Sequence, residues 1–427
     1  MGRKVKNRNT RVGFVLTRFS GTDGVSLEVS KWLHVLETDG HTCFFLSGEC
    51  DEPGERCRVV PEMHFQHPDV AEIYATSFTS RVRPEATTRR IQELKNHLKA
   101  AIAAFVREYG LELLIVENAL AIPLHLPLGI ALTEYIAESG MPTIAHHHDF
   151  FWERKRFLVN CVWDYLNMAF PPHLPQILHV VINSSASNQL SLRTGISATL
   201  IPNVMDFDHP PPAADAYAGG LRPDLGLAAG EHLLLQPTRV VHRKGIEHAI
   251  ELVDRLGVKA RLVISHAGGD EGPAYEQHLR RMAERWGVPV SFEADIIRTA
   301  RGQTPDGRRV YSLADAYDAA DLVTYPSEVE GFGNAFLEAI YHRRPIVVNN
   351  YSIFATDIRP KGFHLIEFDG TITDETVWWT ERLLQDPALV KDMTDHNYSV
   401  AARHYSYAVL HRHLQALLTD LFGEPAE

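Results

Sequence analysis

Short apolar runs alternate with helical stretches along most of the chain. Residues 11–17 (RVGFVLT) form a run of strand length, and apolar residues at helical spacing follow it up to Asp39-Gly40. A second apolar run covers residues 42–46. These segments predict a βαβ unit, and a continued alternation of strands and helices is typical of a parallel sheet that is covered on both faces.

The alternation continues with one interruption. A helix is predicted around 89–108, and further strands are predicted at 113–116, 142–146, 179–183, 233–237, 261–265, 288–292, 322–325, 346–349 and 364–368. A stretch rich in Pro, Gly and Ala follows Asn203 and shows little periodicity. We therefore predict two doubly wound, Rossmann-like α/β domains at 1–205 and 206–404, and an amphipathic C-terminal helix within 405–427 whose apolar stripe must be buried.

The bulk properties exclude several classes of protein. A length of 427 residues suits two domains, and a formal net charge of -12 argues against binding to nucleic acid. The four cysteines contain no close pair of the zinc or redox type, so we expect a reducing cytoplasm. The basic start, MGRKVKNRNTR, precedes an apolar run too short for a signal peptide or membrane span, and we interpret it as a frayed tail.

The segment PSEVEGFGNAFLEA carries two glutamates at a strand-to-helix turn. Glu330 lies in the predicted loop and Glu338 in the helix that begins near Asn334. Glycines at such a turn let the backbone approach a ligand, and free amides at a helix start favour an anion such as a diphosphate. A carboxylate among apolar neighbours needs hydrogen-bond donors, which sugar hydroxyls supply. Taken singly, each glutamate would be interpreted as a solvated residue.

A second turn, TRVVHRKG, follows the predicted strand at 233–237. Arg239 and Lys244 are candidates to stabilise the charge that develops on a departing diphosphate. We find no convincing acidic metal motif and predict that no metal ion or other cofactor is required. A basic helix start at the surface is the alternative interpretation, and it suits Arg243 best.

Polar residues also follow predicted strands of the first domain. His146, His147 and His148 point to alternate faces of an extended chain, so they cannot readily bind one metal together. We expect a hydrogen-bonding role for one of them at the expected ligand-binding cleft. For His146 and His147 the alternative is that their side chains are packed beneath that cleft. Candidate acceptor-binding residues are Glu117, Asn118, Asp149, Trp152, Arg154 and Arg156. The aromatic and cationic members favour an anionic sugar, although a solvated basic face explains them equally well.

Glu330 and Glu338, with seven residues between them, closely resemble the EX7E motif of glycosyltransferase family 4, whose members have the GT-B fold. Three further segments resemble the same family: the preceding AYDAADLVTYPS, the Arg344-Pro345 edge and the TRVVHRKG turn. The resemblance implies that Glu338 binds the ribose, Glu330 lies near the donor sugar, and His148 lies near the reacting sugar. Catalytic roles are carried over to His148, Arg239, Lys244 and Glu330, and donor contacts to Gly24, Arg239, Lys244, Gly331, Phe332, Gly333, Asn334 and Glu338.

The resemblance further implies a retaining hexosyltransferase with a nucleotide-sugar donor bound mostly by the second domain, an acceptor bound by the first, and a C-terminal helix that crosses back to the first. The segments ENALAIPLHLPLGIALTEYI and HHHDFFWERKR resemble the branch that makes mannosylglucosylglycerate-type solutes, which favours GDP-mannose, then UDP-glucose, and an acceptor such as glucosyl-3-phosphoglycerate. Alternatives are a sucrose-phosphate synthase-like or a lipid- or inositol-phosphate-dependent transferase, a GT-B epimerase or phosphorylase, and a non-catalytic sugar-nucleotide binding module. No nucleic-acid partner or transmembrane segment is expected.

Overall fold

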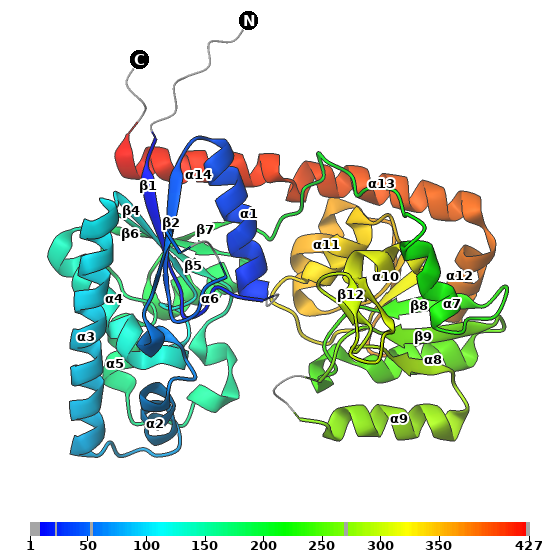
Figure 1. The fold of residues 1–427 in the computed structure, drawn as a ribbon, viewed down its shortest axis with the longest axis horizontal. Coiled ribbons are helices and arrows are strands. Elements are labelled where there is room, and N and C mark those ends of the chain that lie inside the picture. Colours follow the sequence, from blue (N-terminus) through cyan, green and yellow to red (C-terminus); the bar gives the residue numbers. More distant parts are fainter. Residues whose placement is uncertain (1–8, 22–23, 52–53, 269–271, 424–427) are drawn as a thin grey trace, which may run out of the picture. The chain divides into compact units, whose positions relative to one another are not determined.

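The computed structural model describes residues 9–21, 24–51, 54–268 and 272–423, and the chain divides into two compact units (Figure 1). One unit consists of Met1–Asn203 and Tyr407–Glu427, and the other of Val204–Ser406. The domain boundaries predicted from the sequence follow residues 205 and 404. Each unit has its own parallel sheet and its own apolar core.

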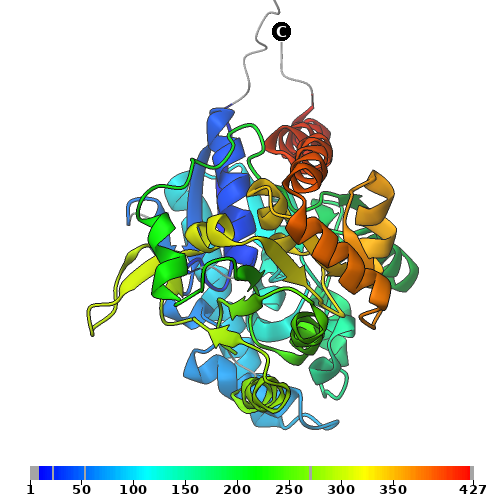
Figure 2. The same cartoon turned by 90° about the vertical axis from the view of Figure 1, so that its right-hand side faces the viewer.

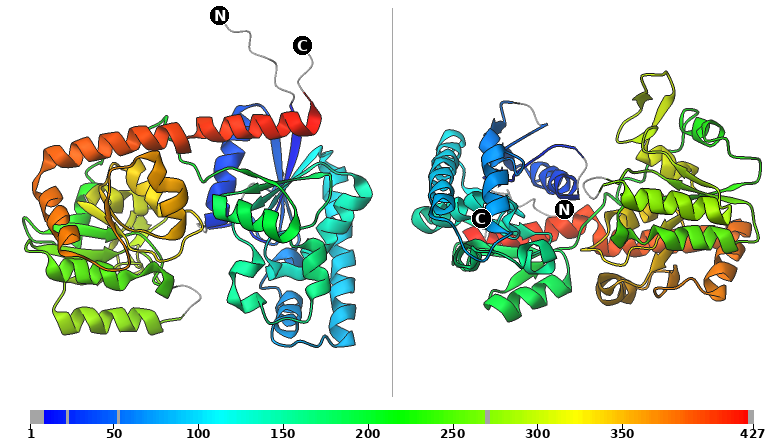
Figure 3. Two further views of the ribbon diagram at one scale, coloured as in Figure 1. Left: turned by 180° about the vertical axis from the view of Figure 1, so that it is seen from behind. Right: turned by 90° about the horizontal axis from the view of Figure 1, so that it is seen from below.

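The first unit is built on a seven-stranded parallel sheet in the order β3-β2-β1-β4-β5-β6-β7. Its strands are β1 (Arg11–Val15), β2 (Thr42–Ser47), β3 (Cys57–Val59), β4 (Leu113–Glu117), β5 (Thr143–His147), β6 (Ile177–Val181) and β7 (Ala198–Leu200). Its α-helices are α1 (Gly24–Thr38), α2 (Pro68–Ser77), α3 (Glu85–Tyr109), α4 (Leu126–Ser139), α5 (Trp163–Ala169), α6 (Ser184–Thr194) and α14 (Tyr407–Phe422). Helices α3 and α4 lie on one face of the sheet and α1 on the other (Figures 1 and 3), which confirms the doubly wound prediction.

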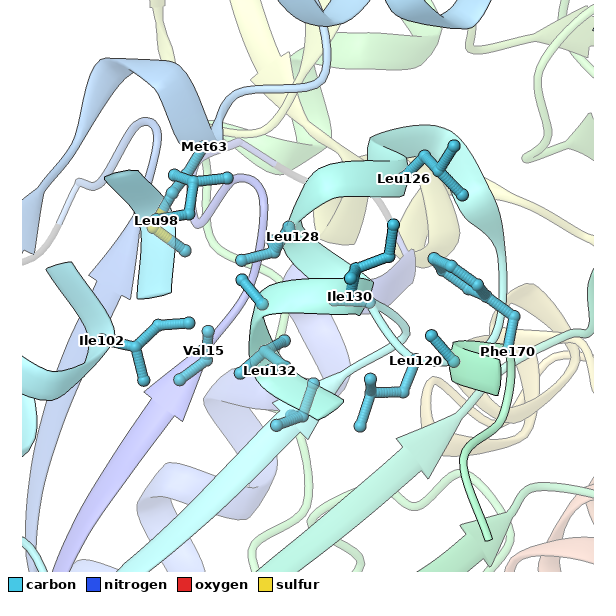
Figure 4. Packing of buried hydrophobic residues seen from close by; sticks show 14 of the residues in the cluster. Val15, Met63, Leu98, Ile102, Leu120, Leu126, Leu128, Ile130, Leu132 and Phe170 are labelled. Atoms are coloured by element: carbon cyan, nitrogen blue, oxygen red, sulfur yellow. The ribbon is translucent and has the colours of Figure 1, made fainter. Parts of the chain in front are cut away.

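The core of the first unit lies between the sheet and helices α3 and α4. Leu98, Ile102 and Phe105 recur on one face of α3 and are fully buried, as the helical spacing requires. Val15 of β1 and Leu132 of α4 meet them in the same cluster (Figure 4). Each buried aliphatic side chain of this kind contributes about 1.5–3 kcal/mol, so the cluster fixes the sheet whose strand ends carry the candidate site.

Helix α14 buries its apolar stripe within the first unit. Leu410, Leu414 and Leu417 are buried, and the helix packs against α1. His411 Nε2 lies 2.9 Å from a carboxylate oxygen of Asp39, and Gln415 Nε2 donates to the other oxygen at 3.0 Å. The apolar stripe predicted at the end of the chain is thus buried within the first unit, where α14 packs against α1.

The second unit is built on a six-stranded parallel sheet in the order β10-β9-β8-β14-β15-β16. Its strands are β8 (His232–Gln236), β9 (Ala260–Ile264), β10 (Val290–Phe292), β14 (Leu322–Tyr325), β15 (Ile346–Asn349) and β16 (Ile366–Phe368). Its α-helices are α7 (Leu221–Asp224), α8 (Ile246–Arg255), α9 (Ala274–Trp286), α10 (Leu313–Ala319), α11 (Asn334–Tyr341), α12 (Asp374–Gln385) and α13 (Pro387–Tyr405). This unit also confirms the predicted α/β architecture.

A small sheet in the second unit was missed by the sequence analysis. Strands β11 (Ile297–Arg298), β13 (Arg309–Ser312) and β12 (Gly302–Gln303) pair in that order, and the yellow-green hairpin stands out from the rest of this unit in Figure 2. The Pro- and Gly-rich stretch after Asn203 is anchored to it, because Tyr217 donates to the Val310 carbonyl at 2.9 Å and Asp215 pairs with Arg301 at 2.7 Å. That stretch is held by side chains, which backbone periodicity does not reveal.

Two other expectations are corrected. The strand predicted at 179–183 is β6, which ends at Val181, because the Asn183 side chain caps α6 by accepting from the Ala186 amide at 2.7 Å. Cys50 and Cys57 form a disulfide, which their spacing in the sequence did not suggest. The two cysteines come together because β3 pairs with β2 and the chain between them turns back.

The cytoplasmic location stays a prediction. No helix in the described ranges has the length and apolar character of a membrane span.

His125 makes the stability of the first unit depend on pH. Its Nδ1 accepts from the Leu128 amide at 3.2 Å and caps α4, while its Nε2 lies 2.7 Å from the Glu62 carbonyl, so both bonds suit the neutral ring. Burial lowers the pKa of His125 to about 4. The unfolded chain binds a proton near pH 6.5, so between these values unfolding takes up a proton and stability falls as the pH falls.

We therefore expect the free energy of unfolding to fall by about 2 kcal/mol through this residue alone between about pH 7.5 and about pH 5. The measurement is urea unfolding at both pH values for the wild type and for His125→Asn, which keeps a capping side chain that does not titrate. An equal acid loss in both proteins would contradict the assignment.

Candidate functional site

The basic turn after β8 buries one lysine and leaves one arginine exposed. Residues His242–Lys244 form a 3-10 turn, and Gly245 (φ +56°) leads into α8. A Cβ on Gly245 would lie 2.6 Å from the Pro326 carbonyl oxygen, so only glycine allows this close approach. Lys244 is 7% exposed, whereas Arg239 is exposed and makes no side-chain hydrogen bond within the described ranges.

Glu330 is the counter-ion of this turn. Its carboxylate accepts from Lys244 Nζ through one oxygen and from Arg243 Nη1 at 3.1 Å through the other. Burial alone raises the pKa of Glu330, but the charges of Lys244 and Arg243 lower it below its ordinary value. Burial lowers the pKa of Lys244, and Glu330 offsets part of that effect. A buried ion pair of this kind needs good geometry on both sides, because desolvation of each charge is costly.

His266 belongs to the same end of the sheet, although the sequence analysis missed it. It follows β9, its Nδ1 lies 2.8 Å from Ser265 Oγ, and burial with the nearby charges of Lys244 and Arg239 lowers its pKa. The carboxyl ends of β8 and β9 therefore place Arg239, Lys244 and His266 together. The signal that could have found His266 is its position directly after a predicted strand.

The glycine-containing loop before α11 is packed tightly against two tyrosines. Gly333 has a φ of +120°, and a Cβ there would lie 2.6 Å from Tyr325 Oη and 3.1 Å from Tyr351 Oη. Tyr351 Oη donates to the Phe332 carbonyl at 2.7 Å, and Phe332 is buried while Gly331 is exposed. The loop thus presents backbone at the start of α11, where Asn334 is the first helical residue.

Glu338 of α11 is held by a tyrosine of the neighbouring helix α10. Tyr317 Oη donates to Glu338 Oε2 at 2.8 Å, and burial with the charge of Glu338 raises the pKa of Tyr317 well above its ordinary value. The Tyr317 ring stacks on His342 at 5.0 Å between centroids, and His342 Nδ1 lies 3.1 Å from Asp318 Oδ1. Within the described ranges Glu338 Oε1 accepts no hydrogen bond, which leaves it for a ligand with hydroxyl donors.

In the first unit the three histidines alternate as predicted. His146 Nδ1 and His148 Nε2 lie 3.0 Å and 3.2 Å from the same oxygen, Glu117 Oε2. His147 points to the opposite face, where its Nε2 lies 2.8 Å from Nδ1 of the buried His179. His148 is thus separated from its neighbour His147 by the pleat of β5.

Glu117 and Asn118 are turned toward the histidines. The Glu117 side chain has no exposed surface, and burial, which raises its pKa, is outweighed by His146 and His148, which lower it to about 2. Burial lowers the pKa of His148, but the bond to Glu117 raises it above the ordinary value. Among the described residues, the Glu117 carboxylate contacts these two histidine rings, and its predicted contact with an acceptor stays a prediction.

Helix α1 contributes a buried ion pair that the sequence analysis missed. Glu28 and Lys31 pair with each other at 1% and 9% residue exposure, and the charge of Glu28 acts on His148. Their spacing of three residues is typical of a surface pair, so nothing in this spacing indicates burial. Gly24, the predicted donor contact, is the exposed first residue of α1, and Thr22 and Asp23 of the same turn lie outside the described residues, as does the basic start at 1–8.

The aromatic and basic residues predicted to bind the acceptor are largely engaged by neighbouring side chains. Trp152 stacks on Phe150 at 4.6 Å, and the Arg193 guanidinium lies 5.4 Å from its ring centre. Arg154 bonds to Asp149, and the Arg156 guanidinium lies 4.9 Å from the Phe157 ring centre. The acceptor-binding roles of Asp149, Trp152, Arg154 and Arg156 stay predictions.

One group of side chains has the composition of a metal site. The ligand atoms of Glu117, His146 and His148 lie within 4.8 Å of one another. The three consecutive histidines were not predicted to share a metal, but this group combines two of them with a carboxylate from β4, which the prediction did not include. The two contacts to Glu117 Oε2 are also those of a hydrogen-bonded cluster, since one carboxylate oxygen can accept from both rings.

Comparison with known proteins gives consistent matches. The family model described as "Glycosyl transferases group 1" matches residues 231–367. The mannosylglucosylglycerate synthase of Thermotoga maritima is 30% identical over 419 residues, which cover 90% of this chain and 94% of that protein. The enzyme of the same name from Petrotoga mobilis is 28% identical over 384 residues, covering 83% and 86%. The solved sucrose-phosphate synthase of Thermosynechococcus elongatus has a TM-score of 0.65 at 15% identity, covering 97% of this chain and 99% of that chain.

Proposed function

Because the chain belongs to glycosyltransferase family 4, we propose that it moves a hexose from a nucleotide diphosphate sugar to a small anionic sugar acceptor with retention of configuration and without a metal ion. The donor binds the second unit and the acceptor the first. GDP-mannose is the favoured donor and UDP-glucose the next. The mannosylglucosylglycerate synthases among the relatives support a mannosyl transfer, with glucosylglycerate or its 3-phosphate as acceptor.

The observation that carries the proposal is the group of cations at the ends of β8 and β9. Lys244 is buried, held by Glu330, and close to the exposed Arg239, which has no partner of its own within the described ranges. Fixed positive groups in a poorly solvated place stabilise negative charge that develops as the bond to the diphosphate breaks. Two side-chain cations thereby supply what a divalent ion supplies in other transferases.

The carboxylates bear on the route by which the proposed retention is reached, and Glu330 is not placed to serve as a covalent nucleophile. Glu330 already bonds to Lys244 and Arg243, which makes it a poor nucleophile. The acceptor hydroxyl therefore attacks the anomeric carbon on the face that the diphosphate leaves. The bond between the anomeric carbon and the phosphate oxygen breaks, and the proton of the hydroxyl passes to the departing phosphate. No covalent glycosyl-enzyme forms in this scheme.

The proposal is tested by ligand stabilisation followed by transfer. The melting temperature is measured with GDP-mannose, UDP-glucose and ADP-glucose, since a ligand stabilises the native state that it binds. The protein and the stabilising donor are then incubated with glucosylglycerate, its 3-phosphate, the type of acceptor used by a sucrose-phosphate synthase, and inositol phosphate. The product and its anomeric configuration are identified by NMR. Donor binding without transfer to any of these acceptors would favour a non-catalytic module, and an inverted product would refute retention.

Chelation is expected to leave turnover unchanged. In the proposed scheme Arg239 and Lys244 contact the diphosphate, so no step needs a divalent ion. Initial rates are compared with and without excess EDTA, and a parallel metal-dependent transferase serves as the control for chelation. A loss of activity that magnesium or manganese restores would show that a metal site operates.

A further inference from the structure

We propose that Glu117 and Asn118 are positioning residues that hold His148 by its ring and by its main chain. The inference rests on the proposed function, in which His148 lies beside the reacting sugar. It assigns to two consecutive residues at the end of β4 a role different from the acceptor contact that the sequence suggested.

Glu117 fixes the imidazole ring. Strand pairing places Glu117 opposite His146 in β5, and His148 lies two residues further on the same face. His148 Nε2 is 3.2 Å from Glu117 Oε2, so the carboxylate holds a proton on Nε2, whether the ring is neutral or charged. In the neutral ring Nδ1 is then the acceptor, and it is the nitrogen left for a substrate hydroxyl. His148 retains 11% side-chain exposure, whereas Glu117 has none.

Asn118 fixes the main chain of the same residue. Its Oδ1 accepts from the His148 amide at 3.1 Å, and its Nδ2 donates to Asp149 Oδ1 at 3.0 Å. Asn118 adopts a left-handed conformation with φ of 57°, which is uncommon for a non-glycine residue, although asparagine enters this region more readily than most. Strain of this kind persists where surrounding contacts impose it, and it is concentrated at functional sites.

Further side chains surround the pair of rings formed by His146 and His148. Trp32 of α1 stacks on His146 at 4.4 Å, and the His146 and His148 rings lie 4.4 Å apart. The charged groups that act on His148 are Glu117 from β4, Glu28 from α1 and Asp149 from the turn after β5, and Glu28 is itself paired with Lys31. His148 is thus held directly by Glu117 and Asn118 and packs on the His146 ring, which Trp32 covers. A displacement of about 1 Å at a reacting centre costs on the order of 10² in rate.

The test uses Asn118→Gly, Glu117→Leu and Glu117→Gln in the full-length protein. Glycine adopts the left-handed conformation without strain, so Asn118→Gly should keep the wild-type melting temperature within a few degrees and yet lower kcat about tenfold or more. Glu117→Leu should lower kcat on the order of 10², and Glu117→Gln, which keeps an acceptor oxygen, should recover part of that loss. The affinity for the donor nucleotide, held by the second unit, should not change.

A spectroscopic readout is independent of activity. In protein with ¹⁵N-labelled histidine, the Nε2 of His148, identified by its loss in His148→Gln, should carry a proton at every pH at which the protein is folded. The assignment is overturned if folded Asn118→Gly retains wild-type kcat, if His148 Nε2 is unprotonated at alkaline pH, or if purified wild type contains a stoichiometric divalent ion lost in Glu117→Leu. If the wild type transfers no sugar but Nε2 is protonated as expected, the proposed function fails, whereas the positioning of the His148 ring by Glu117 stands.

Discussion

Replacement of Lys244 by alanine is expected to lower kcat by on the order of 10²–10³, as the loss of one preorganised donor to a developing oxyanion does. The physical reason is that Lys244 is buried and held by Glu330, so in the proposed complex it meets the departing diphosphate without reorganisation. Steady-state rates at saturating donor measure the effect. Because the stabilised charge grows only as the bond breaks, kcat should fall far more than the affinity for the donor.

Two further variants make the result specific. Arg239→Ala removes an exposed cation, so we expect a loss of the same order with little change in melting temperature. Lys391→Ala removes a cation whose side chain is 78% exposed and which pairs with Asp395 on the same helix, α13. This change should leave kcat unchanged. In Lys244→Ala the Glu330 carboxylate keeps its bond to Arg243, which favours a folded protein. A folded Lys244→Ala protein with wild-type kcat would refute the role.

The features that the sequence predicted well are local. The two glutamates, the basic turn and the glycines each lie within a few residues of a strand end, and strand-to-helix turns such as β14–α11 follow from periodicity. The alternation of His146, His147 and His148 is equally local, since it follows from the pleat of one strand. Local patterns therefore predicted both folds and the elements that carry the candidate residues.

The features that the sequence did not predict depend on contacts between distant segments. The orientation of Glu117 depends on the register of β4 with β5, and the burial of Glu28 and Lys31 depends on how α1 packs on the sheet. The hydrogen bond from Tyr317 to Glu338 joins two helices. In each case the residue has an ordinary interpretation within its own segment, and only the partner from another segment changes it.

Replacement of Glu338 by alanine is expected to raise the KM and Kd for the donor by roughly 10–100-fold with a much smaller change in kcat, because a charged hydrogen-bond partner is worth about 1.5–3 kcal/mol. Glu338 binds the ribose in the proposed complex, away from the bond that breaks, so it stabilises ground state and transition state alike. Isothermal titration with the nucleoside diphosphate and saturation kinetics measure the two constants. Tyr317→Phe is the matched variant: it keeps the carboxylate but removes the 2.8 Å bond that orients it, so a smaller rise in KM is expected. If Glu338→Ala instead lowered kcat and left KM unchanged, the glutamate would act on the reacting centre, and the assignment of Glu338 to the ribose would be wrong.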